Sequence, residues 1–449
     1  MKKFDVLVIG SGAGLEVASF AAEKGLSVAL VEEGRLGGTC LNRGCIPSKM
    51  LIHSADVAET IKSSQKFGIK SKIEGIDFTS IVKRVSEVVD TDSSGIEQAV
   101  RKSGNPVLYK VRSKFIGPKQ MQAGNEQIEA DKVFIVGGTR PSTPPVPGLE
   151  DTPYLDSTKA LRLEKQPEHL VIIGGGYIAA ELAHFFGALG TKITILVRGE
   201  RMLDNEDDEI ADWFTKEFSK KHKILFKTET EAVSYQDNRF IIKLKNDGGK
   251  LESDQLLVAT GRTPNTDILD VKTTGVDVDD KGYIKVNDYL ETNVDGIWAF
   301  GDIVGILPFR HTANDQVGFA IGNAFTDKKV PFDPFAIGHA VFSSPQVGGV
   351  GKTEQELKKE GISYKVGKAE LKDTGMGGAL QENGLAKVIT DETGKKILGV
   401  HIVGPQASIL IHEAIVAMKG NGTVDAITQS VYIHPALPEW LQRAFFDIG

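Results

Sequence analysis

The stretch FDVLVIGSGAGLEVASFAAEKGLSVALVEEG (residues 4–34) decides the fold class of this chain. An apolar run leads into a glycine-rich turn, then into small and apolar residues, and then into a second apolar run. The same order recurs in HLVIIGGGYIAAELAHFFGALGTKITILVRGE (residues 169–200). Each copy predicts a strand, a tight turn, a helix and a second strand, which is a βαβ unit. Because the motif occurs twice in its full context, we predict two Rossmann-like dinucleotide-binding domains.

Glycines at the two turns are the first candidates for holding a dinucleotide. Residues without a side chain allow the tight turn and let the backbone approach a pyrophosphate, which lies against the N–H groups of the helix start. The third motif position is Leu15 in the first copy, so we expect the neighbouring Gly14 to relieve the crowding; Ala179 fills this position in the second copy. The candidate glycines are Gly10, Gly12, Gly14, Gly174 and Gly176.

The residues that follow the second strand differ between the copies. In the first copy this strand ends at Glu32, where an acid would bond the ribose of FAD or NAD. In the second copy the strand ITILV (193–197) leads into Arg198, with Arg201 nearby. A guanidinium there suits the 2′-phosphate of NADP(H), although Glu200 weakens this interpretation. The alternative is that both arginines are solvated loop residues.

Two further segments share a pattern that is expected where the chain leaves each nucleotide domain. DKVFIVGGTRPSTPPVPG (131–148) and DQLLVATGRTPN (254–265) each run an apolar strand into glycine, arginine and proline. A third strand, in GIWAFGDIVG (296–305), ends at Gly301 and Asp302 and is predicted to return to the first sheet. An acid at the carboxyl end of such a strand faces the ligand crevice.

The last part of the chain has a different pattern. From about residue 333 it contains short β-like runs at 339–351, 362–371 and 385–404. One helical run, ILIHEAIVAMKGN (409–421), follows them. This mixture predicts an α+β domain of its own.

Composition and charge narrow the range of functions. The chain has 449 residues, with 53 Lys plus Arg against 60 Asp plus Glu, for a net charge of -7. This balance provides no global attraction to nucleic acid or to an anionic membrane, so we expect small-molecule partners. The apolar run at residues 6–9 is shorter than the roughly 7 to 15 residues of a signal peptide, and no apolar stretch approaches the ~20 that span a bilayer. We predict a cytoplasmic protein.

The only two cysteines, Cys40 and Cys45, lie in LGGTCLNRGCIPSK (36–49). On a regular helix residues five apart point about 140° away from one another, so a disulfide between them requires an irregular backbone. Asn42, Gly44 and Pro47 permit such a departure.

Helical periodicity in KMLIHSADVAETI (49–61) predicts that the cysteine pair lies near a helix start, where the helix dipole favours a thiolate. Zinc is the competing interpretation, but it normally needs four ligands and His53 is the only histidine nearby. We therefore favour a redox disulfide beside the first nucleotide site and predict no metal.

Five motifs together resemble those of one family. They are GGTCLNRGCIPSK (37–49), the doubled nucleotide motif, ATGRTPN (259–265), AFGD (299–302) and HPALPE (434–439). The resemblance is to the FAD-dependent pyridine nucleotide-disulfide oxidoreductases, and it covers essentially the whole chain. It implies FAD and either NAD or NADP as cofactors, NADP being favoured by Arg198, and a homodimer with a shared active site.

The resemblance also predicts the domain order. The fold expected is α/β, with two Rossmann-like dinucleotide-binding domains and a C-terminal α+β dimerisation domain. The predicted ranges are 1–140 for the first part of the FAD-binding domain, 141–264 for the NAD(P)-binding domain, 265–332 for the return to the FAD-binding domain, and 333–449 for the interface domain.

The same resemblance implies which residues bind each cofactor. Glu32 would bind the adenosine ribose of FAD and Asp302 its ribityl chain, and Tyr177 would cover the nicotinamide pocket. The implied FAD site comprises Gly10, Gly12, Gly14, Glu32, Gly38, Thr39, Lys49, Gly301 and Asp302. The implied NAD(P) site comprises Gly174, Gly176, Tyr177, Glu181, Arg198 and Gly261.

Catalytic roles follow from the resemblance as well. Cys45 would be the thiolate packed against the flavin, and Cys40 would exchange with substrate. Lys49 would pair with Glu181 near flavin N5. The catalytic set is completed by an acid/base pair that the partner subunit supplies, His434 and Glu439.

The chemistry gives a reason for each part. Hydride passes between nicotinamide and flavin, the flavin exchanges electrons with the disulfide, and a base moves protons during thiol-disulfide exchange. Histidine has a suitable pKa near neutrality, and a carboxylate on its other nitrogen fixes the tautomer. Taken alone, His434 would be an ordinary structural histidine; the full set of motifs favours the catalytic interpretation.

Within the family, LNRGCIPSK (41–49) is most similar to the dihydrolipoamide dehydrogenase pattern, which is the leading hypothesis. The substrate would be a small dithiol or disulfide, and a 2-oxo acid dehydrogenase complex is a possible partner. Arg198, HPALPE and FRHTAN (309–314) favour the alternative, an NADPH-dependent reductase of a low-molecular-weight disulfide such as glutathione or mycothione. A flavoprotein scaffold or sensor without turnover is the third hypothesis.

Overall fold

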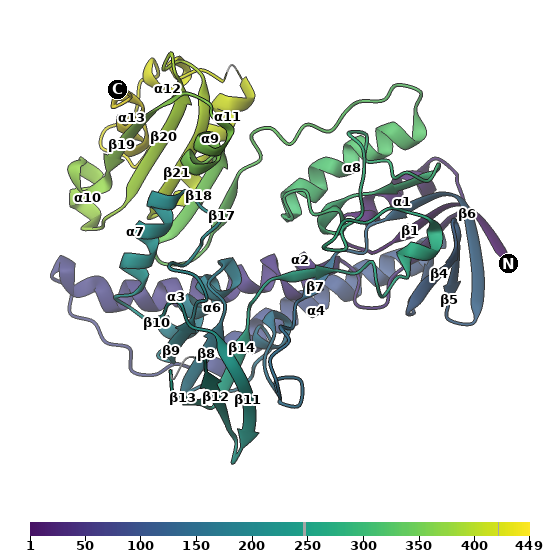
Figure 1. Ribbon diagram of the computed structural model, residues 1–449, viewed down its shortest axis with the longest axis horizontal. Coiled ribbons are helices and arrows are strands. Elements are labelled where there is room, and N and C mark those ends of the chain that lie inside the picture. Colours follow the sequence, from purple (N-terminus) through teal and green to yellow (C-terminus); the bar gives the residue numbers. More distant parts are fainter. Residues whose placement is uncertain (246–247, 421) are drawn as a thin grey trace. The chain divides into compact units, whose positions relative to one another are not determined.

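The computed structural model describes residues 1–245, 248–420 and 422–449 (Figure 1). The chain forms two compact units and passes between them several times. Unit 1 comprises Met1–Ser48, Val82–Ser142 and Gly261–Pro334. Unit 2 comprises Lys49–Ile81, Thr143–Thr260 and Phe335–Gly449. The predicted domain ranges remain predictions, and residues 246 and 247 of the range 141–264 lie outside the described residues.

Unit 1 is built on a sheet of seven strands in the order β3-β2-β1-β6-β5-β4, with β16 also paired to β6. The strands β3, β2, β1, β6 and β16 run parallel, and β4 and β5 add an antiparallel extension. The bounds are β1 (Lys2–Ile9), β2 (Val28–Val31), β3 (Val107–Tyr109), β4 (Ser113–Gly117), β5 (Gln120–Ala123), β6 (Glu126–Ile135) and β16 (Ile297–Ala299). The pairing of β16 with β6 confirms the predicted return of this segment to the first sheet.

Helices cover the parallel part of this sheet. In Figure 1, α1 and α8 lie together over one face of it. The strands are apolar along most of their length because a parallel sheet is buried on both faces. The helical segments of unit 1 are α1 (Gly14–Glu23), α2 (Gly38–Arg43), η2 (Val271–Thr274), η3 (Gly301–Val304) and α8 (Arg310–Phe325). Two long helices, α3 (Cys45–Ser63) and α4 (Phe78–Ser103), have residues in both units.

The two segments with the shared glycine, arginine and proline pattern pair with one another. Strand β7 (Thr139–Pro141) runs antiparallel to β15 (Arg262–Pro264). The ladder is reinforced by Arg140, whose guanidinium donates two hydrogen bonds to Asp267, at 2.8 and 2.7 Å. The sequence pattern predicted two exits from nucleotide domains; their pairing into one ribbon is a tertiary feature.

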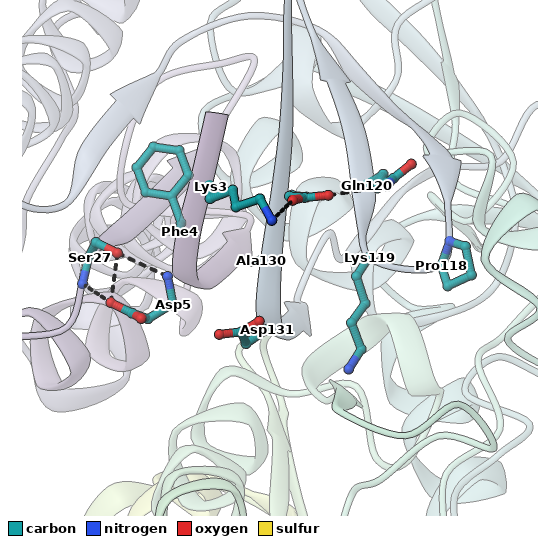
Figure 2. Close-up of a pocket in the computed structure, with 10 residues that line it drawn as sticks. Lys3, Phe4, Asp5, Ser27, Pro118, Lys119, Gln120, Ala130 and Asp131 are labelled. Carbon is teal, nitrogen blue, oxygen red and sulfur yellow. Dashed lines mark hydrogen bonds and ion pairs between the residues drawn. The ribbon is translucent and has the colours of Figure 1, made fainter. Parts of the chain in front are cut away.

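A pocket lies at the amino end of β1 (Figure 2). Three of its charged side chains have partners: Lys3 lies 3.0 Å from Glu129, and Asp5 accepts from the Ser27 hydroxyl at 2.7 Å. Dinucleotides bind at the carboxyl ends of parallel strands, which for β1 is the opposite end. This pocket is therefore not part of the nucleotide site.

The described residues of unit 2 form three sheets. A parallel sheet has the order β10-β9-β8-β14, a three-stranded antiparallel sheet has the order β11-β12-β13, and a five-stranded sheet has the order β17-β18-β21-β20-β19. The bounds in the first two sheets are β8 (His169–Ile173), β9 (Lys192–Leu196), β10 (Lys223–Leu225), β11 (Thr230–Gln236), β12 (Arg239–Leu244), β13 (Lys250–Ser253) and β14 (Gln255–Val258). Those in the third are β17 (His339–Val341), β18 (Gln346–Gly351), β19 (Tyr364–Glu370), β20 (Leu385–Asp391) and β21 (Ile397–Gly404).

Helices of unit 2 pack on these sheets. Helix α6 lies on β8 and β9, α11 on β18 and β21, and α13 on β19 and β20. Figure 1 shows α11 and α13 beside the five-stranded sheet. The bounds are η1 (Ser64–Phe67), α5 (Ser157–Ala160), α6 (Tyr177–Ala188), α7 (Asp208–Phe218), α9 (Glu354–Glu360), η4 (Leu371–Asp373), α10 (Gly375–Leu380), α11 (Ala407–Gly420), α12 (Asp425–Thr428) and α13 (Pro438–Phe446).

The five-stranded sheet and its helices form the α+β part expected from the sequence. The three β-like runs at 339–351, 362–371 and 385–404 are strands, and the helical run is α11. The last residue of that run, Asn421, lies outside the described residues. Trp440 anchors this core: it is fully buried and donates a hydrogen bond to the Ala369 carbonyl at 2.8 Å. The predicted fold class is confirmed.

Within residues 1–245, 248–420 and 422–449, no helix is both long enough and apolar enough to cross a membrane.

Candidate active site

The two nucleotide turns have the same steric requirement. Gly10 has φ +102°, and a Cβ added there would lie 2.3 Å from the Val136 carbonyl oxygen. Gly174 has φ +127°, and its Cβ would lie 2.2 Å from the Ala259 carbonyl oxygen. Only glycine meets both demands, since a side chain would be strained at such a φ and would overlap the backbone. The matching geometry confirms that the sequence repeat is a structural repeat.

Gly14 provides the close packing between helix and strand in the first copy. It is buried, and a Cβ there would lie 2.9 Å from Val8 Cγ1. Leu15 is only half-buried. Gly14 therefore relieves the crowding that Leu15 would otherwise cause, as predicted. In the second copy Ala179 is buried within α6.

Glu32 directly follows β2 and is held at the first turn by hydrogen bonds. Its Oε2 accepts from the Ser11 N–H at 3.0 Å and from the Ser11 hydroxyl at 2.8 Å. Its Oε1 accepts from the Gly34 N–H at 2.9 Å. The carboxylate is thus fixed at the strand end, where a ribose diol would be bound.

The backbone of α2 closes on the same turn. A Cβ on Gly38 would lie 2.6 Å from the Gly12 Cα, so two glycines make this contact possible. A bare backbone surface and the start of α1 next to Glu32 suit a dinucleotide. The residues of the first turn therefore fit FAD.

Asp302 stands just after β16, in the short helix η3. Its Oδ2 accepts a hydrogen bond from the Thr139 hydroxyl at 3.2 Å. Gly301 is fixed by its N–H, which donates to Gln316 Oε1 at 2.8 Å. The acid lies at the carboxyl end of a sheet strand, as expected, and its contact with a ribityl chain stays a prediction.

The cysteine pair spans a break between two helices. Cys40 belongs to α2, and Cys45 is the first residue of α3. Gly44 lies between them with φ −146° and ψ −116°, values far from those of a helix. The backbone therefore departs from a regular helix between the cysteines, as their pairing requires. Both side chains are half-buried.

Asn42 holds the segment between the cysteines. Its side-chain amide donates to the Leu36 carbonyl at 2.9 Å and to the Gly38 carbonyl at 3.0 Å. Cys45 lies at the N-terminus of a long helix, where the dipole favours a thiolate. The expectation that the pair lies at a helix start is confirmed.

Lys49 and Glu181 form an ion pair in unit 2. The Lys49 ammonium lies 2.8 Å from each carboxylate oxygen of Glu181. Glu181 also accepts from the Phe342 N–H at 3.0 Å, and the ammonium lies 4.6 Å from the centre of the Phe342 ring. The predicted pairing is present; its place beside flavin N5 stays a prediction.

Tyr177 begins α6, directly after the second glycine turn. Its hydroxyl donates to Glu206, and its ring stacks on His339 with 5.9 Å between centroids. Sequence reasoning missed both partners because they lie 29 and 162 positions further along the chain. Nothing in the sequence pattern marks either residue.

The two arginines that follow β9 in the second copy have different surroundings. Arg201 is held by Asp204, Asp208 and Asp212, at 2.9, 2.5 and 3.2 Å. It is therefore neither a solvated loop residue nor available to a phosphate.

Arg198 is exposed. Together with Lys245, which has the larger effect, its charge lowers the pKa of the Glu229 carboxyl. Glu200, which could have favoured NAD, lies 2.6 Å from Lys227. These contacts leave Arg198 as the accessible guanidinium at this strand end.

His434 and Glu439 form the predicted pair. His434 Nδ1 lies 2.9 Å from Glu439 Oε1, and Glu439 Oε2 accepts from the Ala436 N–H at 2.9 Å. The hydrogen bond with His434, followed by that from Ala436, lowers the pKa of the Glu439 carboxyl. The His434 side chain is 76% exposed, so the ring nitrogen that remains for proton transfer, Nε2, is open to a substrate.

Roles for Thr39, Gly176 and Gly261 in cofactor binding stay predictions.

The chain matches the family model for pyridine nucleotide-disulphide oxidoreductase over residues 4–317. It matches the dimerisation domain of the same family over residues 337–445. The chain therefore belongs to the pyridine nucleotide-disulfide oxidoreductases, flavoenzymes that use FAD and NAD(P)H.

Individual relatives cover the whole chain at similar identity. Mycothione reductase from Mycobacterium tuberculosis (strain H37Rv) is 34% identical, with 100% of both chains covered. Dihydrolipoyl dehydrogenase from Thermus scotoductus is 36% identical, with 99% of this chain and 97% of that protein covered. The Cu(II) complex of the HOCl-induced flavoprotein disulfide reductase RclA from Escherichia coli has a TM-score of 0.89 at 29% identity, with 99% of both chains covered.

Proposed function

We propose that this protein is a homodimeric enzyme that passes two electrons between NADP(H), FAD, the Cys40–Cys45 pair and a small disulfide. The observation that carries the finer part of the proposal is the end of β9. There Arg198 is exposed, Arg201 is held by three aspartates and Glu200 is paired with Lys227. An exposed guanidinium at this strand end favours a nucleotide with a 2′-phosphate.

FAD, when bound, supplies the two-electron chemistry that links a nicotinamide to a disulfide. In this proposal the first turn holds it: the glycine backbone faces the pyrophosphate and Glu32 the ribose. Asp302, at the end of β16, would face the ribityl chain. Two observations support this assignment. Gly12 and Gly38 pack closely because neither has a side chain, and hydrogen bonds from Ser11 fix the Glu32 carboxylate.

The cysteines exchange with the substrate in two steps. The Cys40 thiolate attacks one sulfur of the substrate disulfide, forms a mixed disulfide and releases the first product thiol. The Cys45 thiolate then attacks Cys40 Sγ, releases the second thiol and leaves Cys40 and Cys45 joined by a disulfide. Reduction of that disulfide by two electrons restores both thiols, so atoms and electrons balance over the cycle.

His434 moves the protons in this proposal. In the dimer its Nε2 would protonate each departing substrate thiolate, and the second copy would supply it. Glu439 accepts from Nδ1 and so keeps the ring in one orientation. The dimerisation domain of the family, matched at residues 337–445, supports a dimeric active site.

Oxidation of dihydrolipoamide is the second candidate function. It is favoured by the cysteine motif LNRGCIPSK (41–49) and by the similarity to dihydrolipoyl dehydrogenases. In that case a 2-oxo acid dehydrogenase complex would be the partner. For either function we infer a cytoplasmic enzyme, because a reducing compartment suits a cysteine pair that must cycle.

A matrix of steady-state assays tests the proposal. The purified enzyme is assayed with NAD, NADP and their reduced forms against dihydrolipoamide, lipoamide, glutathione disulfide and mycothiol disulfide. Consumption of NADPH with a glutathione-like or mycothiol-like disulfide is the expected result. Rapid reduction of NAD by dihydrolipoamide would instead establish the second candidate. A yellow protein that turns over none of these would favour a flavoprotein without disulfide chemistry.

A further inference from the structure

The loop 199–207, which lies between Arg198 and α7, contains a strained residue. Leu203 has φ +54°, in the left-handed region that residues with a side chain rarely adopt, and it is buried. A residue keeps such a conformation only where the surrounding structure holds it, and strained residues cluster at functional sites. The disulfide exchange described above does not use Leu203.

The backbone of Leu203 ties the loop to the second nucleotide turn. Its N–H donates a hydrogen bond to the Gly175 carbonyl at 2.8 Å. Gly175 lies between Gly174 and Gly176, the two glycines expected to face a pyrophosphate. The loop starts next to Arg198, the residue proposed to face the 2′-phosphate. It therefore connects the two places at which the phosphates of a nucleotide would be held.

A buried ion pair holds the other end of the loop. Asp207 Oδ1 lies 2.8 Å from the ammonium of Lys387 on β20, and these side chains are 0% and 1% exposed. The ammonium also lies 2.6 Å from Glu354. Burial by itself would lower the pKa of the Lys387 ammonium, but the hydrogen bonds to Asp207 and Glu354 outweigh it and the pKa is raised. The lysine therefore stays charged. Because the Glu206 N–H donates to the Leu203 carbonyl at 2.9 Å, the ion pair lies one chain turn from the strained residue.

Two helix starts meet at this ion pair. Asp207 Oδ1 accepts from the Glu209 N–H at 3.2 Å, at the start of α7. Its Oδ2 accepts from the Glu354 N–H at 3.1 Å, at the start of α9. The Gln355 side chain donates to the Glu206 carbonyl at 2.7 Å. These bonds fix the end of the loop to α9 and to the five-stranded sheet.

We propose that the loop 199–207 preorganises the phosphate-binding end of the nucleotide site, and that Leu203, Asp207 and Lys387 are its positioning residues. This role rests on the proposed function and adds how the site is fixed before a nucleotide binds. Without the ion pair, Leu203 would relax to an ordinary backbone conformation and its hydrogen bond to Gly175 would be lost. The turn and the strand end would then no longer be held at one spacing, and ordering them would weaken binding.

The first test measures NADPH oxidation by the FAD-loaded full-length enzyme, with ferricyanide as electron acceptor. Lys387→Met should raise the KM for NADPH by about tenfold, the effect of one lost charge-assisted hydrogen bond. Flavin content and kcat at saturating NADPH should change by less than about twofold, because the first turn is untouched. Asp207→Asn keeps the shape of the acid and should raise the KM by about threefold. Lys396→Met, at an exposed lysine next to β21, is the matched control and should leave the KM unchanged.

A pair of substitutions at Leu203 tests the strain. Leu203→Ala and Leu203→Gly both remove the buried side chain, but only glycine adopts a positive φ at little cost. Adding Lys387→Met should therefore raise the KM for NADPH by about tenfold in Leu203→Ala and by less than about threefold in Leu203→Gly. Equal increases in the two backgrounds would overturn the role of Leu203.

Different results separate the role of the loop from the proposed function. An unchanged KM in Lys387→Met would overturn the role of the loop and leave the proposed function intact. A kcat or a flavin content that falls as much as the KM rises would also overturn it, because the ion pair would then serve only the fold. If Lys387→Met does not fold, Asp207→Asn decides by the same measurements. A wild-type enzyme that uses NADH would contradict the choice of NADP, and the same KM ratios with NADH would still decide the role of the loop.

Discussion

The two nucleotide turns have the same backbone but different surroundings. At each turn a glycine with positive φ packs against the backbone of a neighbouring strand, Gly10 at 2.3 Å and Gly174 at 2.2 Å for an added Cβ. At the following strand end, the first copy has the anchored acid Glu32 and the second has the exposed cation Arg198. The backbone thus provides the same turn in both copies, and we propose that the residue type at the following strand end sets the preference for a ligand.

The largest expected effect concerns the cysteines that both turns are proposed to serve. Cys45→Ser should lower NADPH-dependent reduction of a disulfide by at least about 1000-fold, because the second step of the exchange loses its nucleophile. Both turns are intact in this variant, so NADPH oxidation with an artificial electron acceptor such as ferricyanide should persist. Loss of both activities would show that the cysteine is needed for cofactor binding, and Cys40→Ser provides the parallel measurement.

One substitution in each turn tests whether the two turns bind different cofactors. Gly10→Ala should yield protein without flavin, because the new Cβ would overlap the Val136 carbonyl. Gly174→Ala meets an equivalent overlap at Ala259, but it should retain FAD and lose reduction by NADPH. Flavin content and reduction rate measure the two outcomes.

Gly25→Ala is the matched control for this pair. Gly25 also has positive φ, at +79°, but a Cβ there would meet no atom within 4 Å. It therefore reports the cost of backbone strain without steric overlap, and flavin content should be retained. If Gly10→Ala bound FAD as well as Gly25→Ala does, the first turn would not be the flavin site.

A substitution of Arg198 tests whether the residue after β9 sets the preference between NADP and NAD. Arg198→Glu should shift the ratio of kcat/KM from NADP towards NAD by roughly 10- to 100-fold, since an acid at this position binds the ribose diol and repels a 2′-phosphate. Arg201→Met is the control, because its guanidinium is already paired with three aspartates, and it should leave the ratio unchanged. An unchanged ratio in Arg198→Glu would show that this residue does not read the phosphate.

The smallest effect is expected at the strand end of the first turn. Glu32→Gln keeps the shape of the side chain and one oxygen that can accept from Ser11, so flavin should still bind. Binding should be about tenfold weaker, because a charge-assisted hydrogen bond is lost. Titration of the apoprotein with FAD measures the affinity. Glu33→Gln, an exchange of the same kind at the adjacent residue, is the control, and equal losses in both variants would argue against a ribose contact.

Much of the site could be predicted because it is local in sequence. Cys40 and Cys45 are five positions apart, with the helix break at Gly44 between them. His434 and Glu439 are also five positions apart. Spacing and residue type therefore suffice to predict each pair. The pairing of Lys49 with Glu181 spans 132 positions and was accessible only through resemblance to a family. Arg201 shows the limit of local reasoning, since its aspartates lie within eleven residues and still the sequence did not reveal their contacts.

The sequence by itself determined the doubled βαβ pattern, the chemistry of the cysteine pair and the family, because periodicity, turn glycines and short motifs act over a few residues. Only the tertiary structure decided that Arg198 and not Arg201 is accessible, that β7 pairs with β15, and that Tyr177 is held by Glu206 and His339. Each of these joins side chains or strands whose positions depend on how the whole unit packs. Burial and long-range hydrogen bonds are properties of the folded chain, and no local pattern encodes them.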